Sequence, residues 1–303
     1  MDTLTDATVL VTGGAGFIGS HLVEAFAPEN DVRVFDDFSN GARANLPDGV
    51  AVIDGDVRDA DALAEAMDGV DVVFHEAAIV SVSRSVDAPE ETHAVNVDAT
   101  LSVLERARDE DARVVVASSA AIYGAPETTP ITENARKEPS SPYGLEKLSV
   151  DHYCRLYNDL YGLDTVALRY FNVYGPRQSS GPYAGVITSF VEQARAGGPL
   201  RVQGDGTQTR DFVHVSDVVQ ANRLAATTDH TGEAFNVGTG RAVEIRQLAT
   251  LIRDVVDPGV EVEFGDARAG DIRASVADVS KARERLGYDP GVALADGLAD
   301  LVA

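Results

Sequence analysis

Residues 12–20 read TGGAGFIGS and come directly after a short β-branched run at 8–12. The glycines at 13, 16 and 19 suit a tight turn, a close approach of the backbone to a pyrophosphate, and close packing of the helix that follows. The N–H groups at the start of that helix favour an anion. The pattern predicts a phosphate-binding turn between a strand and a helix. Its expected ligand contacts are Gly13, Gly16, Phe17, Ile18 and Gly19.

An acidic residue, Asp36, ends the next β-branched run. A carboxylate at that point of a strand–turn–helix–strand unit hydrogen-bonds the ribose hydroxyls of a dinucleotide and repels a 2′-phosphate. The pair of features therefore predicts dinucleotide binding and favours NAD over NADP. Arg33 and Arg43 lie nearby in the sequence and keep a contact with a 2′-phosphate open.

The first two thirds of the chain alternate β-branched runs with alanine-rich amphipathic stretches, which is typical of βαβ units. After Tyr174, Gly-Pro pairs mark a looser region. We expect an α/β fold with a Rossmann-type doubly wound parallel sheet and a smaller α/β substrate-binding lobe, the site lying between them. The expected NAD-binding domain comprises residues 1–174 and about 212–238, and the second domain about 175–211 and 239–303. Predicted strands lie at 8–12, 32–36, 50–54, 70–75, 113–118 and 165–169, and predicted helices at 59–67, 96–108, 186–196 and 244–256.

Charge excludes several classes of function. The chain has 25 basic and 49 acidic residues, for a net charge of −24, and only three of the basic residues are lysines. Such a surface repels nucleic-acid phosphates and anionic membranes, so neither is an expected partner. An acidic, lysine-poor composition also suits a high-salt cytosol, where screening removes self-repulsion.

Three further observations concern compartment and metals. Residues 1–14 lack the basic flank and apolar core of a signal peptide, and no apolar run reaches the length of a membrane span. The single cysteine, Cys154, cannot form an internal disulfide and is expected in the core. The six histidines show no metal-ligand spacing. We expect a cytoplasmic protein without a metal site.

Tyr143 and Lys147 stand four residues apart in SPYGLEK, so they share one face of a helix. An ammonium group near a phenol stabilises phenolate and would make Tyr143 a usable base. Ser141 can cap this helix, and Pro142 suits its first position. Ser119 ends the fifth predicted strand, at the edge where parallel sheets bind ligands, and could hydrogen-bond the same substrate oxygen.

With these motifs in place, the chain resembles the extended short-chain dehydrogenases/reductases, specifically the NAD-dependent nucleotide-sugar epimerases and dehydratases. The resemblance covers nearly the whole chain and rests on segments in family order: TGGAGFIGS, DDFSNG, GDVRD, HEAA, ASSAAIYG, SPYGLEK, LRYFNVYGPRQ, GDGTQTRDFVHVSD, FNVGTG and RAGDIRAS. It implies Ser119, Tyr143 and Lys147 as catalytic residues. It also implies further NAD contacts from Asn40, Gly41, Asp56, Val57, Ala77, Ala78, Asn96 and Tyr170.

The same resemblance assigns a UDP-sugar substrate to the second lobe. It implies that Asn172, Arg210 and Arg268 hold the diphosphate and that residues 185–190 lie near the uracil. Guanidinium groups suit this task because their fork geometry matches phosphate oxygens. Ser275 takes the position where a bulky side chain excludes 2-acetamido sugars in some relatives, so N-acetylhexosamines are expected to fit.

The residues after Ser119 bear on the reaction. Family dehydratases carry Asp-Glu there and related decarboxylases a Glu, whereas this chain has Ala120 and Ala121, which move no proton. We therefore expect C4 epimerisation of a UDP-hexose through a 4-keto intermediate. Two alternatives stay open: another nucleotide-sugar activity, such as uronate epimerisation, dehydration or decarboxylation, and a non-catalytic NAD-binding sensor. The resemblance further implies a homodimer in which helices at 96–108 and 143–161 form a four-helix bundle.

Overall fold

A computed structural model describes residues 3–179, 185–267 and 270–302. Its largest element is a seven-stranded sheet in which every neighbouring pair is parallel, in the order β11-β6-β5-β4-β1-β2-β3. The predicted Rossmann-type sheet is confirmed. Its strands are β1 (Thr8–Thr12), β2 (Asp31–Asp36), β3 (Ala51–Asp54), β4 (Val72–His75), β5 (Arg113–Ser119), β6 (Thr165–Tyr170) and β11 (Glu233–Val237).

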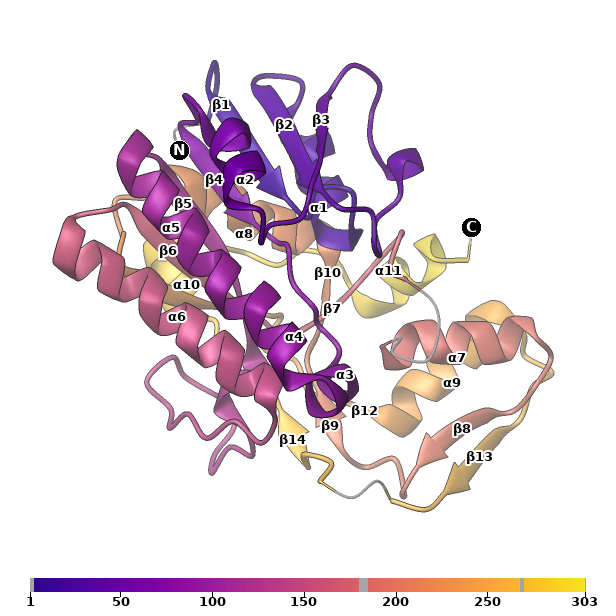
Figure 1. The fold of residues 1–303 in the computed structure, drawn as a ribbon. Helices are drawn as coiled ribbons and strands as arrows, with labels where there is room; N and C mark the ends of the chain where they lie inside the picture. Colours follow the sequence, from indigo (N-terminus) through magenta and orange to yellow (C-terminus); the bar gives the residue numbers. More distant parts are fainter. Residues whose placement is uncertain (1–2, 180–184, 268–269, 303) are drawn as a thin grey trace.

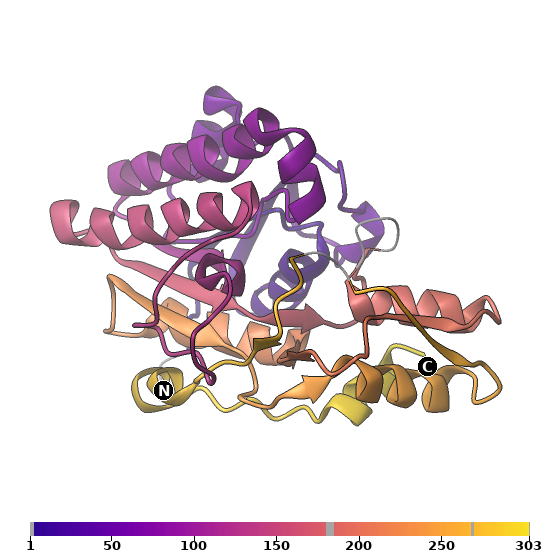
Figure 2. The ribbon, with the colours of Figure 1, turned by 90° about the horizontal axis from the view of Figure 1, so that it is seen from below.

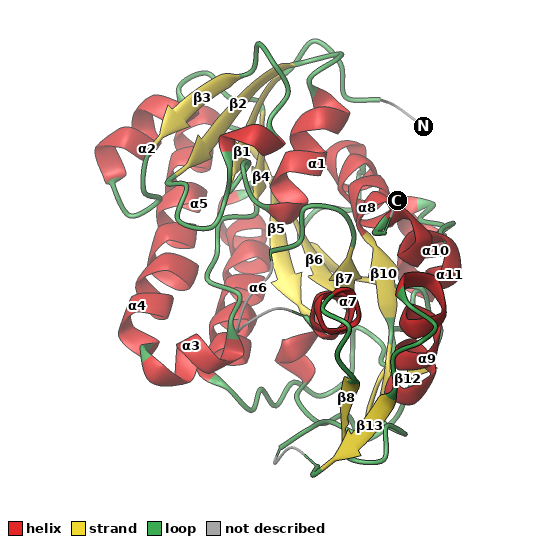
Figure 3. Cartoon of the chain, turned by 90° about the vertical axis from the view of Figure 1, so that its right-hand side faces the viewer, coloured by secondary structure: helices red, strands yellow, loops and turns green. Residues whose placement is uncertain are grey.

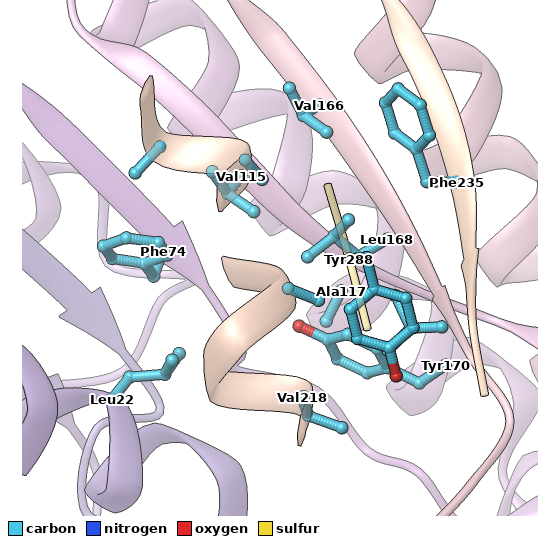
Figure 4. Close-up of a cluster of buried hydrophobic side chains, with 14 of the residues drawn as sticks. Leu22, Phe74, Val115, Ala117, Val166, Leu168, Tyr170, Val218, Phe235 and Tyr288 are labelled. Carbon is cyan, nitrogen blue, oxygen red and sulfur yellow. The ribbon is translucent and has the colours of Figure 1, made fainter. Parts of the chain in front are cut away.

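Helices cover both faces of this sheet (Figure 3). On one face lie α1 (Phe17–Phe26), α8 (Val215–Thr227) and α10 (Ser280–Leu286). On the other lie α2 (Ala60–Met67), α5 (Ala99–Glu110) and α6 (Pro142–Tyr161). Two short helices, α3 (Val82–Asp87) and α4 (Pro89–His93), lie beside the N-terminal turns of α6. Alternating strand residues fill two apolar clusters, one under each helical layer, and Figure 4 shows part of the cluster on the α1 side. Burial on both faces explains why the strands read as near-continuous apolar runs.

A third apolar cluster lies outside the central sheet, where α7 and α9 pack together beside β8 and β13 (Figure 1). Three small sheets accompany it: β7 with β10, β8 with β13, and β9 between β12 and β14. The elements are β7 (Asn172–Tyr174), α7 (Val186–Arg195), β8 (Leu200–Gln203), β9 (Thr209–Arg210), β10 (Phe212–His214), β12 (Val243–Glu244), α9 (Ile245–Val256), β13 (Val262–Gly265), β14 (Ala274–Ser275) and α11 (Leu294–Asp300).

The chain crosses between these two parts more than once. After β6 it forms β7 to β9, then returns through β10 and α8 to place β11 at the edge of the central sheet. A second excursion builds β12 to β14, after which α10 packs against β11. Figure 2 shows the orange and yellow C-terminal third running beneath the central sheet and out to the third apolar cluster.

One predicted helix differs from the structure. The pattern at 96–108 predicts a single α-helix, whereas residues 94–98 form the wider turn η2 (Ala94–Asp98) and α5 begins only at Ala99. Asn96 lies in this turn and bonds both backbone groups of Ile79. Two short helices, η1 (Arg43–Asn45) and η3 (Ala120–Tyr123), complete the described elements. Among these elements, no helix combines the length and apolarity that a bilayer crossing requires.

Candidate active site

The predicted phosphate turn joins β1 to α1 at the point where the sheet order reverses, because β1 lies between β2 and β4. Gly13 has φ +67°, and a Cβ there would lie 2.7 Å from the backbone N of Ala77. A Cβ on Gly19 would lie 2.2 Å from the Gly13 carbonyl oxygen. Gly16 is the N-cap of α1 and brings no side chain over the end of the helix. The turn therefore presents bare N–H groups at a ligand-binding edge.

Asp36 ends β2 beside this turn and is buried. Its carboxylate accepts hydrogen bonds from the backbone N–H groups of Ala15 (2.9 Å) and Phe38 (2.8 Å). Burial raises the pKa of Asp36, and the two backbone bonds oppose that shift. Gly41 lies against the same carboxylate, since a Cβ on it would come within 2.9 Å of Asp36 Oδ1, and Asn40 is exposed in the same loop.

The two arginines that kept a 2′-phosphate contact open are engaged with other groups. Arg33 donates to the carbonyl of Asp68 at 2.6 Å. Arg43 lies over the ring of Phe38, with its Cζ 4.5 Å from the ring centroid, and its Nη2 is 3.4 Å from Asp54. Both guanidinium groups therefore have partners within the protein, and the buried carboxylate of Asp36 beside the phosphate turn fits NAD.

The other predicted cofactor residues lie at the same edge of the sheet. Asp56 follows β3 and is held by Arg58, whose hydrogen bonds lower the pKa of Asp56, while the Val57 side chain is buried. Ala77 and Ala78 follow β4, and Ala77 contacts the phosphate turn.

Asn96 holds the loop that follows β4. Its side chain is buried, and its amide oxygen accepts from Ile79 N at 2.8 Å. Its amide nitrogen donates to the Ile79 carbonyl (3.1 Å) and to Glu146 Oε2 (2.6 Å). The structure thus has Asn96 fixing the loop that carries Ala77 and Ala78.

Ser119 ends β5, and its hydroxyl accepts a hydrogen bond from Ala121 N at 3.1 Å, which starts η3. Ala120 and Ala121 are the first residues of η3, so methyl groups follow Ser119 in the structure as in the sequence. The Ser119 hydroxyl lies close enough to the Tyr143 phenol to lower the pKa of that phenol.

Tyr143 lies in the first turn of α6. As predicted, Ser141 caps this helix by accepting from Gly144 N at 3.1 Å, and Pro142 is its first residue. Gly144 brings α6 close to η3, since a Cβ there would lie 2.8 Å from the Ala121 carbonyl oxygen. Capping and close packing together fix Tyr143 beside Ser119.

The sequence predicts that Lys147 lowers the pKa of Tyr143, but in the structure the pKa of Tyr143 is raised. Lys147 is buried, and its ammonium donates to the carbonyl of Ala117 at 2.8 Å. Burial raises the pKa of Tyr143 to about 12, the neighbouring Ser119 hydroxyl opposes this rise, and the charges of Glu146 and Glu76 add to it. The chain by itself therefore keeps Tyr143 protonated, because desolvation outweighs the nearby favourable contact.

Two carboxylates of the site escaped the sequence reasoning. Glu146 is buried on α6 and accepts from Thr92 Oγ1 (2.7 Å) and Asn96 Nδ2 (2.6 Å). Glu76 follows β4, and Tyr170 donates its hydroxyl proton to Glu76 Oε1 at 2.7 Å. For Glu76, the sequence did offer a signal: a charged residue directly follows the apolar strand VVFH at 72–75, at the edge of the sheet where ligands bind.

The predicted substrate residues lie among the small sheets. Asn172 begins β7 and donates to the Asp211 carbonyl at 3.1 Å. Arg210, on β9, is mostly buried and pairs with Asp271. Ser275 on β14 is the register partner of Arg210, so these two predicted contacts are neighbours. The segment 185–190 has Gly185 as the N-cap of α7. Arg268 lies outside the described residues.

Comparison with known proteins gives a consistent picture. The model of the NAD dependent epimerase/dehydratase family matches residues 9–238. The chain belongs to this family. The UDP-glucose 4-epimerase of Mycolicibacterium smegmatis is 42% identical, over 97% of this chain and 96% of that protein. The structure of the UDP-N-acetylglucosamine 4-epimerase from Methanobrevibacter ruminantium M1, in complex with UDP-N-acetylmuramic acid, matches with a TM-score of 0.95 and 37% identity, covering 99% of this chain and 98% of that chain.

Other relatives in this epimerase/dehydratase family differ in activity. The Thermus thermophilus UDP-glucose 4-epimerase in complex with NAD matches with a TM-score of 0.89 and 37% identity, over 97% of each chain. A UDP-N-acetyl-alpha-D-glucosaminuronate decarboxylase of Bacillus cytotoxicus is 34% identical over 97% of this chain and 96% of that protein. NAD is the cofactor of this family, and the bare turn and Asp36 fit it.

Proposed function

We propose that the chain catalyses C4 epimerisation of a UDP-hexose, with UDP-glucose and UDP-galactose as the substrate pair. The observation that carries the proposal is the arrangement at the end of β5: the Ser119 hydroxyl lies close enough to the Tyr143 phenol to lower its pKa, and the next two residues, Ala120 and Ala121, carry only methyl groups. This set can remove and return the proton of one hydroxyl. It has no second acid or base there for elimination of water.

The proton steps are assigned to this chain's residues. Tyr143 acts in its phenolate form, which the positive charge of bound NAD would favour. It then accepts the proton of the sugar C4 hydroxyl, directly or through the Ser119 hydroxyl, and gives it back to the same oxygen. NAD, held by the turn at Gly13, Gly16 and Gly19 and by Asp36, would supply reversible hydride transfer at C4; return of the hydride to the other face of a turned 4-keto sugar would invert that carbon. Lys147 provides positive charge at this edge of the sheet, held in place by the Ala117 carbonyl.

The second lobe is proposed to hold the UDP group. Arg210 and Asn172 supply donors for the diphosphate, and Arg210 exchanges Asp271 for phosphate oxygens when substrate binds. The hydroxymethyl side chain of Ser275 lies beside Arg210 on the neighbouring strand and leaves room for a 2-acetamido group. UDP-N-acetylhexosamines are therefore proposed as additional substrates, and the similarity to a UDP-N-acetylglucosamine 4-epimerase supports this.

A homodimer is part of the proposal. The outer face of α6 exposes Leu145, Leu156 and Leu160, which recur at helical spacing. This face lies next to α5, against which α6 packs. A second copy of the same helix pair would cover these leucines in a four-helix bundle. Leu156→Glu together with Leu160→Glu should convert a dimer to a monomer in light scattering; a wild-type monomer would refute this assignment.

The deciding experiment is direct. The protein, saturated with NAD, is incubated with UDP-glucose, UDP-galactose, UDP-N-acetylglucosamine and UDP-glucuronic acid in separate reactions, in buffers of low and molar KCl. Products are identified by NMR. An equilibrium mixture of C4 epimers is expected. A 4-keto-6-deoxy sugar or a pentose would overturn the proposal in favour of dehydration or decarboxylation, and bound NAD without turnover of any sugar would favour a sensor.

A further inference from the structure

Glu76 places a carboxylate where three neighbouring strands end. It directly follows β4, whose last residue, His75, is the register partner of Val116 on β5. The next position on β5 is Ala117, so Glu76 and Ala117 are adjacent at the edge of the sheet. On β6, Tyr170 donates its hydroxyl to Glu76 Oε1 at 2.7 Å.

A hydrogen-bond chain orients this carboxylate. Asn222 on α8 donates to the Tyr170 oxygen at 2.9 Å, and Tyr170 in turn donates to Glu76. Tyr170 and Ala117 belong to the same apolar cluster, labelled in Figure 4. Packing in this cluster therefore holds the Tyr170 ring, and the Tyr170 hydroxyl orients the Glu76 carboxylate.

Lys147 reaches the same edge from α6, on the opposite face of the sheet. Its side chain is buried, and its Nζ donates to the carbonyl of Ala117, the residue adjacent to Glu76. A buried ammonium is costly unless a negative charge lies nearby. Of the titratable groups that face it, Glu76 and Glu146 can carry that charge.

Three other titratable groups near Lys147 are neutral at pH 7. Burial lowers the pKa of His75 to about 3, so its imidazole is uncharged at pH 7. The pKa of Tyr143 is raised to about 12 and that of Tyr170 still further, chiefly by burial, so both phenols are protonated.

We propose that Glu76 is a positioning residue that acts through Lys147, supplying the counter-charge that keeps this buried amine protonated at the edge of the sheet where Tyr143 lies. The role deepens the proposed epimerase function and rests on it. Glu146 also faces Lys147, but its two oxygens already accept from Thr92 and Asn96, which hold it toward η2 and α4.

The electrostatics agree with this arrangement. Burial lowers the pKa of Lys147 to about 8, while the charges of Glu76 and then Glu146 hold it up. Burial raises the pKa of Glu76 to about 7, and both the Tyr170 hydrogen bond and the Lys147 charge oppose that rise. Removing the Glu76 charge must therefore lower the pKa of Lys147, so that the amine loses its proton at a lower pH.

The first test reads Lys147 directly. The chain has only three lysines, so protein labelled with ε-¹³C-lysine and saturated with NAD gives three resonances to follow with pH. Lys137→Arg and Lys281→Arg each remove one signal and assign the third to Lys147. In Glu76→Gln, which keeps the acceptor for Tyr170, the Lys147 pKa should fall by about one unit. Glu76→Asp keeps the negative charge, so the pKa of Lys147 in this variant should stay close to the wild-type value.

The second test uses the pH dependence of turnover. With a pKa near 8 in the wild type, a fall of about one unit leaves roughly a tenth of Lys147 protonated at pH 8. Glu76→Gln should then be about fivefold slower than wild type at pH 8 and nearly equal to it at pH 6.5. A general structural defect would slow the enzyme at both values.

The outcomes separate this proposal from the proposed function. An unchanged Lys147 pKa in Glu76→Gln overturns the role of Glu76, as does a larger fall in Glu146→Gln than in Glu76→Gln. If wild type turns over no UDP-hexose yet the Lys147 pKa falls as expected, the counter-charge holds and the epimerase assignment fails. Should Glu76→Gln not fold, Glu76→Ala carries the same comparison.

Discussion

The two sides of the site are built differently. At the edge of the central sheet, Tyr143 and Lys147 are buried on a capped twenty-residue helix, against the ends of parallel strands. On the other side, Arg210 and Ser275 lie on two-residue strands, and Arg210 is paired with a partly exposed aspartate, Asp271. Proton and hydride chemistry tolerates little misplacement, whereas binding of a flexible diphosphate tolerates more. The contrast predicts that changes on the first side lower kcat and changes on the second raise KM.

The largest effect is expected from Tyr143→Phe. Loss of the phenol hydroxyl removes the group that exchanges the substrate proton, so kcat should fall by roughly 10³-fold, within the usual range for a general base. The melting temperature should stay close to that of wild type, because the ring still fills its position. Tyr153→Phe, on the same helix, is the matched control and should keep normal turnover. Near-normal turnover in Tyr143→Phe would show that the base lies elsewhere.

A strong effect on cofactor binding is expected from Gly13→Ala. The new Cβ would lie 2.7 Å from Ala77 N and would sit on a backbone with φ +67°. The loop after β4 must move, so the Kd for NAD, measured by calorimetry, should rise by about 100-fold. Gly49→Ala separates backbone strain from crowding, since Gly49 has φ +85° and no atom within 4 Å of the added Cβ. Equal losses in both variants would mean that strain alone is responsible.

On the second side, Arg210→Ala tests whether the small lobe mainly binds. Losing a charge-assisted contact with the diphosphate should raise KM for the UDP-sugar by about 30-fold while kcat changes little. Arg201→Ala, at a highly exposed position on β8, is the control and should leave KM unchanged. A fall in kcat equal to the rise in KM would contradict the proposed division of labour between the two sides.

The smallest effect concerns the adenosine end. Asp36→Asn keeps an oxygen acceptor for Ala15 or Phe38 but removes the negative charge. The preference for NAD over NADP, measured as a ratio of Kd values, should fall by about tenfold because repulsion of a 2′-phosphate is lost. A ratio that stays constant would assign the discrimination to the shape of the loop that carries Gly41.

Much of the fold was predictable because its signals are local. Strand positions agree to within one or two residues, since β-branched runs buried on both faces leave little choice of boundary, and Ser141 and Pro142 marked the start of α6 correctly. The direction of the Tyr143 pKa was not predictable, because burial depends on η3 and on loops distant in the sequence. The spacing of Tyr143 and Lys147 shows only that they share a helix face.

The missed carboxylates have the same physical explanation. Glu146 and Glu76 read as ordinary surface acids in a chain that has 49 of them. Their importance comes from partners far away along the chain, such as Asn96 and Tyr170. The interruption of the helix at η2 was likewise hidden, because the pattern of apolar residues continues through it.

The edge strand β11 comes from a part of the chain that follows β7 to β10, and this order limits which segments can be exchanged between relatives by recombination. The strand that completes the sheet beside β6 is synthesised only after β7 to β9 have been made, and α10 then packs on it from near the C-terminus. Neither half of the molecule is a continuous stretch of chain. Exchange of substrate preference between relatives is therefore expected to proceed through single residues and short loops, since grafting a whole contiguous cassette would remove an edge strand of the sheet.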